Sequence, residues 1–283
     1  MIRRWFESAR RWPGRGDRGA SALPTGARLE ANLAYGADPA QALDAYLPAA
    51  GPGGSLVLLV HGGGWAAGDK ASEDFIGGKL THWLTSGLVV VSLNHRLWPV
   101  AGPLEQARDV ARALALVQRR AASWGVDTSR IAVIAHSSGA HLAALLAVDA
   151  ALLEAEGARP WAATVLLDGA ALDVARLMRA PHLPLHDRVF GADEAGWLES
   201  SPMHRLSGTP APMLLVHSSA RPASGEQAEA FAAAVRARGA RVELLALPLS
   251  HADIGRQLGV DEAYTAQVDA FLRSAGISEP ASG

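Results

Sequence analysis

Short apolar runs alternate with longer amphipathic segments along most of the chain. Five runs have the length and composition of fully buried strands: residues 55–60, 88–93, 131–134, 164–167 and 213–216. Between two of them, residues 104–124 repeat apolar side chains at helical spacing, with Val110, Leu114 and Val117 on one face. Strands alternating with helices predict an α/β fold, in which helices cover both faces of a mostly parallel sheet.

The flanking segments complete this pattern. Residues 28–47 predict two early strands at an antiparallel edge, and the C-terminal part predicts a helix over 228–238, a strand over 242–247 and a closing helix over 263–274. We therefore expect one domain over residues 27–274. An N-terminal arm (1–26) and a C-terminal tail (275–283) flank it.

One stretch interrupts the alternation. More than forty residues separate the strands that end at Leu167 and begin at Met213, and five of them are proline. Ligands of open α/β sheets bind beyond the carboxyl ends of the strands, so this stretch predicts a partial lid of short helices over about residues 174–212. His182 and His186 have a spacing that a metal pair can use, but Pro184 between them disfavours a helix. We expect no metal there.

Composition narrows the function classes. The net charge of −2 over 283 residues predicts no nucleic-acid partner. The chain has no cysteine, which excludes thiol catalysis and thiolate metal sites. The basic N-terminus lacks the apolar core of a signal peptide and is too polar to span a membrane. A cytoplasmic protein with no transmembrane segment is therefore expected.

The most informative motif surrounds Ser137. Ala135-His136-Ser137-Ser138-Gly139 joins an apolar strand to a small-residue helix over 141–148. A serine in a sharp strand-to-helix turn forms a nucleophile elbow, in which the hydroxyl is forced into the open. Small residues at both ends of the motif suit this turn, since a larger side chain would collide with neighbouring backbone.

A second motif lies upstream. The strand at residues 55–60 runs into His61-Gly62-Gly63-Gly64-Trp65. Three consecutive glycines lose backbone entropy without contributing to packing, but they let backbone amides approach a reacting carbonyl oxygen. Gly63, Gly64 and Ser138 are the expected donors of an oxyanion hole.

Together these motifs resemble the serine esterases of the α/β-hydrolase superfamily. The chain is similar to the His-Gly-Gly-Gly group, which includes hormone-sensitive-lipase-like carboxylesterases and kynurenine-formamidase-like enzymes. The resemblance runs from about Tyr35 to about Leu272 and includes the segments 44–48, 94–99 and 127–131. It departs from the family pattern at Ala135, where glycine is usual, and at His95, where tyrosine is more common.

This resemblance implies the α/β-hydrolase fold and a Ser–His–acid triad in the chain order nucleophile, acid, histidine. His251 follows the last predicted strand, where the fold places the catalytic histidine. Members usually carry an aspartate after the strand at residues 213–216, but Ala220 and Arg221 stand there instead.

Three carboxylates could replace that aspartate. Asp168 ends the preceding strand and is the favoured acid, whereas Glu226 lies nearer the usual loop and Asp173 matches a structural aspartate of relatives. A Ser–His dyad without an acid is a further alternative, at a substantial cost in rate.

The expected function is hydrolysis of small carboxylic esters through an acyl-enzyme, with no cofactor or metal. Trp65, His136 and the lid are expected to line the substrate pocket. Two alternatives stay open: an arylformamidase or amidase, and a non-catalytic binding protein on a hydrolase fold.

Overall fold

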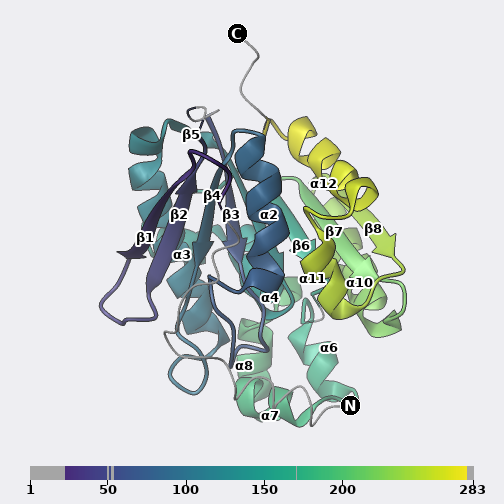
Figure 1. Cartoon of the computed structure of the whole chain (residues 1–283). Helices are drawn as coiled ribbons and strands as arrows, with labels where there is room; N and C mark the ends of the chain where they lie inside the picture. Colours follow the sequence, from purple (N-terminus) through teal and green to yellow (C-terminus); the bar gives the residue numbers. More distant parts are fainter. Residues whose placement is uncertain (1–22, 50, 52–53, 170, 279–283) are drawn as a thin grey trace.

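A single eight-stranded sheet forms the centre of the molecule (Figure 1). The computed structural model describes residues 23–49, 51, 54–169 and 171–278. The sheet order is β1-β2-β4-β3-β5-β6-β7-β8. β2 pairs antiparallel with both β1 and β4, which makes this edge of the sheet antiparallel. The six strands β3 to β8 all run parallel to one another, as the sequence pattern predicts. The strands are β1 (Arg28–Ala34), β2 (Ala42–Leu47), β3 (Gly54–Val60), β4 (Val89–Leu93), β5 (Val126–His136), β6 (Ala163–Leu167), β7 (Met213–Ser218) and β8 (Val242–Leu247).

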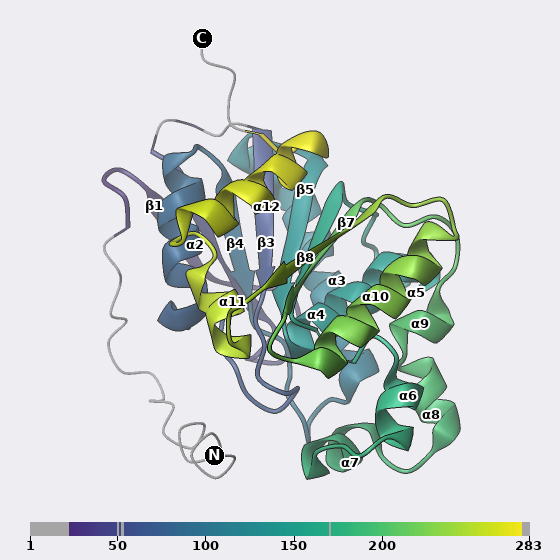
Figure 2. The same ribbon diagram turned by 90° about the vertical axis from the view of Figure 1, so that its right-hand side faces the viewer.

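Helices cover both faces of the sheet (Figure 2). The helices within the described residues are α2 (Glu73–Thr85), α3 (Pro103–Arg120), the 3-10 turn Ala121–Trp124, α4 (Ser138–Val148), α5 (Ala150–Glu154), α6 (Val174–Arg179), α7 (Pro184–Phe190), α8 (Glu194–Glu199), α9 (Pro202–Arg205), α10 (Pro222–Arg236), α11 (His251–Gln257) and α12 (Glu262–Ser274). The helices α2, α11 and α12 pack on one face and α3, α4 and α10 on the other.

The two faces have separate apolar cores because strand side chains alternate in direction. Along β3, Leu56 and Leu58 join the core under α3 and α4, whereas Val57 and Leu59 join the core under α2 and α12. A strand buried on both faces reads as a continuous apolar run, which is why the pattern located the parallel strands correctly.

Helix boundaries were harder to predict. The sequence pattern did not specify α2, which contains the adjacent glycines Gly77 and Gly78. The helix expected over 228–238 starts earlier, at Pro222, because proline needs no backbone N–H partner in the first turn.

The stretch expected to form a lid contains the short helices α6 to α9, and Figure 1 shows α6 to α8 beyond one end of the sheet. Most of the expected N-terminal arm lies outside the described residues. The expected C-terminal tail is anchored at its start, since Ile277 is buried and the Ser278 carbonyl accepts a hydrogen bond from Ser55 Oγ at 2.9 Å.

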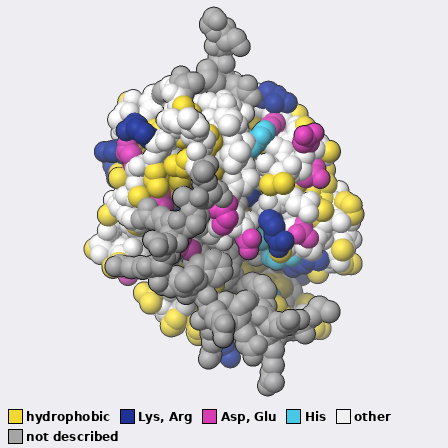
Figure 3. Space-filling view, in the orientation of Figure 1, with side chains coloured by type: hydrophobic (Ala, Val, Ile, Leu, Met, Phe, Trp, Pro, Cys, Tyr) yellow, Lys and Arg dark blue, Asp and Glu magenta, His cyan; other side chains and the backbone are white. Residues whose placement is uncertain are grey.

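Acidic and basic side chains are interspersed over the described part of the face in Figure 3, with no extended patch of one sign. Among the described helices, none is both long and apolar enough to cross a membrane.

Candidate active site

Ser137 occupies a sharp turn between β5 and α4. Its backbone angles, φ 56° and ψ −120°, lie in a region that residues other than glycine rarely adopt. The turn passes directly against the end of β3, since a Cβ on Gly139 would lie 2.4 Å from the carbonyl oxygen of His61. This close approach explains the glycine after Ser138, and the geometry matches the predicted elbow.

Three predicted residues from distant parts of the chain meet at this turn. The Ser137 Oγ lies 2.9 Å from Nε2 of His251, the first residue of α11. The Nδ1 of His251 lies 2.6 Å from Oδ2 of Asp168, directly after β6. An ionised carboxylate can only accept, so Nδ1 carries the ring proton and the lone pair of Nε2 faces the serine hydroxyl.

Asp168 is fully buried and hydrogen-bonded at both oxygens. Oδ1 accepts from the Ser218 amide at 3.0 Å and from the Ser224 hydroxyl at 2.5 Å, while Arg221 forms an ion pair with Oδ2. Burial alone would raise the pKa of Asp168. The hydrogen bonds from His251, Ser224 and Ser218, together with the charge of Arg221, outweigh burial and hold this pKa well below its usual range.

The other two carboxylate candidates lie elsewhere. Glu226 is on the exposed side of α10, where it pairs with Arg176 at 2.7 Å. Asp173 caps α6 by accepting a hydrogen bond from the Arg176 amide at 3.0 Å. The structure therefore brings Asp168, and neither alternative, to His251.

Sequence reasoning missed the partners of Asp168. Nothing in the spacing of Ser224 marks it as a hydrogen-bond donor to a carboxylate that lies 56 residues earlier. Arg221 carried a usable signal, because it stands where the family's aspartate is expected and a cation there would face a relocated acid.

The glycine run forms a tight loop beside the serine. The amide of Ala67 bonds back to the Gly63 carbonyl at 3.0 Å, and Gly63 and Gly64 both have positive φ. A Cβ on Gly62 would lie 2.8 Å from the Cβ of Ser137. The Ser138 amide opens α4 and so has no acceptor within its own helix. The glycine loop and the start of α4 therefore both lie next to Ser137.

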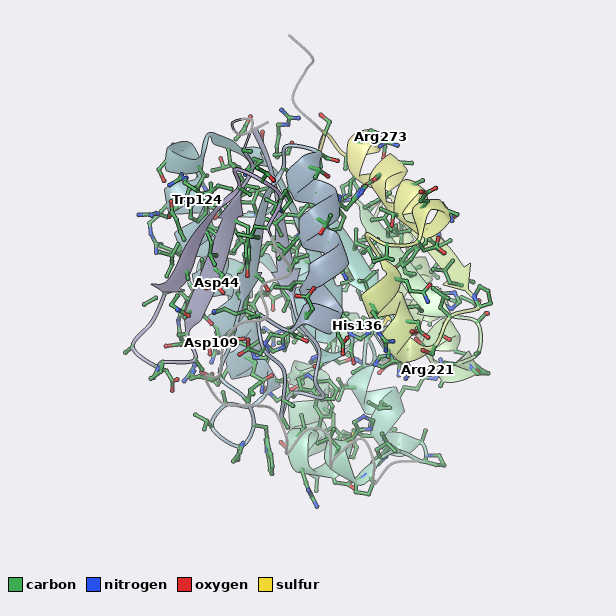
Figure 4. All side chains as sticks on the ribbon, viewed as in Figure 1. Asp44, Asp109, Trp124, His136, Arg221 and Arg273 are labelled. Atoms are coloured by element: carbon green, nitrogen blue, oxygen red, sulfur yellow. The ribbon has the colours of Figure 1, made fainter. Side chains whose placement is uncertain are left out.

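A cavity of about 210 Å³ lies beside the elbow, between the glycine loop, α2 and α11. It is lined in part by Gly62, Gly63, Phe75 and His136. Figure 4 places His136 at the end of the sheet that faces the lid helices. Burial lowers the pKa of His136 to about 3, so the neutral ring donates from Nε2 to the His251 carbonyl at 2.9 Å.

Trp65 is not among the residues that line this cavity. It is 5% exposed and packs edge-on against Phe190 of α7 at 4.9 Å between ring centres. Its indole N–H donates to Nδ1 of His141 at 3.2 Å. The residue therefore joins the glycine loop to the lid.

His182 and His186 also have local partners. His182 Nε2 bonds to Asp187 at 2.9 Å, and the ring of His186 packs edge-on against Trp65. Among the described residues, no group of three or more metal-ligating side chains converges.

Comparisons with known proteins address the fold. The family model BD-FAE matches residues 43–163. The isoprenylcysteine alpha-carbonyl methylesterase of Arabidopsis thaliana is 29% identical over 131 residues, which cover 46% of this chain and 30% of the relative. Esterase B from Lactobacillus rhamnosis superimposes with a TM-score of 0.72 at 21% identity, covering 90% of this chain and 86% of that structure. The chain has the α/β-hydrolase fold.

A second structure extends this likeness. Thermogutta terrifontis esterase 2, in a form phosphonylated by sarin, gives a TM-score of 0.72 at 23% identity over 94% of this chain and the whole of that structure. The predicted fold class is thus confirmed. The sequence match is more local, because the chain spans only 25–30% of the length of the first curated relatives that it matches.

Proposed function

We propose that this chain is a serine carboxylic ester hydrolase. The observation that carries the proposal is that His251 contacts Ser137 through one ring nitrogen, at 2.9 Å, and Asp168 through the other, at 2.6 Å. The esterase names of the curated relatives and of the superimposed structures support the same reaction class.

In the proposed mechanism, Ser137 Oγ attacks the ester carbonyl while His251 Nε2 takes its proton. The amides of Gly63, Gly64 and Ser138 hold the developing oxyanion. When the carbonyl re-forms, the bond to the alcohol oxygen breaks and His251 returns the proton to that oxygen. Water then attacks the acyl-enzyme with His251 again as base, which releases the acid and restores Ser137.

The substrate we propose is a small, uncharged ester. A short acyl or alcohol group matches the size of the cavity of about 210 Å³ beside the glycine loop, whose lining includes His136 next to Ser137 but neither Ser137 nor His251. The helices α6 to α9 serve as the partial lid, because Phe190 of α7 packs on the tryptophan that ends the glycine run. The cytoplasmic location stays a prediction.

The proposal is tested by comparing Ser137→Ala with Ser123→Ala, an exposed serine far from the site. Hydrolysis of p-nitrophenyl acetate and labelling by a fluorophosphonate probe should both be lost in Ser137→Ala and kept in Ser123→Ala. Undiminished turnover by Ser137→Ala would refute the assignment. A wild-type chain that neither hydrolyses esters nor reacts with the probe would instead be a binding protein.

The arylformamidase alternative is tested on the same protein. We expect faster hydrolysis of short esters than of N-formylkynurenine, because the relatives whose names specify a reaction are esterases. A clear preference for N-formylkynurenine would favour the formamidase.

A further inference from the structure

Arg221 touches both the acid and the base of the candidate triad. It precedes α10, and Figure 4 shows it at the same end of the sheet as His136. Its Nη1 pairs with Oδ2 of Asp168 and lies 2.7 Å from Nδ1 of His251. The side chain is 38% exposed while the carboxylate is fully buried, so the guanidinium enters the site from the solvent side.

The contact between Arg221 and His251 cannot be a hydrogen bond in the working state of the triad. Every guanidinium nitrogen is a donor, and the ring Nδ1–H is already directed at Asp168. The two groups therefore share Oδ2 as an acceptor and face each other as donors. A ring that gains a second proton at Nε2 becomes a cation in contact with the arginine.

The charge count shows the consequence. In a Ser–His–Asp triad the carboxylate balances the imidazolium that forms during proton transfer. Here Arg221 already balances Asp168, so protonation of His251 leaves one uncompensated positive charge among the three groups. Like charges in contact disfavour the charged form of a titratable group.

We infer that Arg221 is a positioning residue that holds the Asp168 carboxylate toward His251 and keeps this histidine unprotonated, and so able to act as a base, in mildly acidic solution. This inference rests on the proposed esterase function. The inference gives a role to Arg221, which stands where members of the resembled family carry the aspartate of their triad.

The other ionisable groups around His251 do not duplicate this effect. From β5, the ring of His136 lies 4.7 Å away but is neutral, since burial lowers its pKa to about 3. From α2, Lys79 reaches the Gly255 carbonyl of α11, and burial lowers its pKa to about 7. On α11 itself, Asp253 bonds to Ser250 and pairs with Arg256. Among the described residues, Arg221 is the cation in direct contact with the ring.

The test compares Arg221→Met, which removes the charge but keeps the aliphatic length, with Arg221→Lys, which keeps the charge. Arg241→Met is the matched control, because this partly exposed arginine pairs with Glu243 away from the site. The kcat/KM for p-nitrophenyl acetate and the rate of fluorophosphonate labelling are measured from acidic to neutral pH. The acidic limb of kcat/KM reports the base of the free enzyme.

In Arg221→Met we expect the acidic limb of kcat/KM to move to higher pH by about 0.5–1 pH unit, after allowance for solvent screening. At a fixed pH on this limb, kcat/KM should then be roughly three- to tenfold lower than in the wild type. Arg221→Lys and Arg241→Met should keep the wild-type limb. A purely structural role would lower the thermal midpoint of Arg221→Met without moving the limb. A limb that stays within about 0.2 pH unit of wild type would overturn the inference.

A second measurement uses only the wild-type protein, so it tests the inference even if Arg221→Met does not fold. Raising salt from about 10 mM to about 1 M shortens the screening length from about 30 Å to about 3 Å. Because Arg221 is partly exposed, the wild-type limb should then move toward higher pH, and a limb insensitive to salt would count against the inference. Failure of the wild-type chain to hydrolyse or to be labelled would reject the esterase function itself.

Discussion

Asp168 reaches His251 from the strand that precedes the usual position of the acid. The two residues are 83 positions apart in sequence, yet Oδ2 and Nδ1 lie 2.6 Å apart. Asp168 follows β6 with φ 49°, and its amide bonds to the Val216 carbonyl of β7 at 2.7 Å. The pairing with β7 therefore directs this carboxylate toward the start of α11. It takes the place of an aspartate after β7, the usual position of the acid in the resembled family.

This relationship predicts different results for two acid-to-amide changes. Asp168→Asn should lower kcat by roughly 10³–10⁴-fold, because an amide cannot stabilise the imidazolium and favours the wrong tautomer. Glu226→Gln is the matched control and should keep full activity, since Glu226 pairs with Arg176 on the surface. The measurement is kcat on a p-nitrophenyl ester. Nearly unchanged turnover by Asp168→Asn would indicate a Ser–His dyad.

The same pair shows how far the sequence could go. Ser137 and His251 were predictable because an elbow and a strand-to-helix connection are local patterns with a known chain order. The choice between Asp168 and Glu226 was open because it depends on which side chain β6 and β7 bring next to α11. Which carboxylate reaches α11 is decided by the pairing of β6 with β7 and by which face of α10 is exposed to solvent. Neither property can be recognised from the residues next to Asp168 or Glu226 in the sequence.

The two residues predicted to line the substrate pocket, His136 and Trp65, lie in different places. His136 lines the cavity because it ends β5 beside the elbow. Trp65 has positive φ, and its ring is packed beneath α7. The orientation of a side chain that leaves a glycine-rich turn depends on those backbone angles, which the residue types alone did not reveal.

The packing of the glycine loop against Ser137 predicts that position 62 must be glycine. A methyl group in Gly62→Ala would lie 2.8 Å from the Ser137 Cβ and 2.9 Å from the His136 carbonyl oxygen. The loop must then move away and withdraw its amides. We expect a loss of at least about 10²-fold in kcat, similar to removal of one oxyanion donor.

Gly102→Ala provides the control for this change. Position 102 has φ −76° and no atom within 4 Å of an added Cβ, so activity should be unchanged. Full activity of Gly62→Ala would mean that the loop does not depend on this contact.

The contact between the lid and Trp65 predicts an effect on stability. Phe190 is 8% exposed and packs against both Trp65 and His141. Phe190→Ala should lower the free energy of unfolding by about 2–4 kcal/mol, since it removes a nearly buried aromatic side chain. Leu198→Ala, at a residue that is 37% exposed on α8, should cost much less. Equal losses in denaturant titrations would show that α7 is not anchored through this contact.

Lys79 predicts a pH dependence of stability. This lysine of α2 is fully buried, and its ammonium nitrogen donates to the carbonyls of Phe75 and Gly255. Among the residues that the structure describes, no carboxylate pairs with this ammonium group. Burial accordingly lowers its pKa to about 7, whereas an unfolded lysine has a pKa of about 10.4.

Between these two values the unfolded chain binds more protons at Lys79 than the folded chain does. The free energy of unfolding must therefore rise with pH across this window, by more than about 1 kcal/mol per pH unit from this group. Below about pH 7 the penalty is constant because both states are protonated. Lys79→Met removes the penalty, so its stability relative to wild type should be highest near pH 6 and should fall steadily toward pH 10. Leu80→Met, a buried neighbour with no titratable group, should show a difference from wild type that does not change with pH. Denaturant titrations at several pH values measure both differences, and parallel curves for wild type and Lys79→Met would show that this lysine titrates normally.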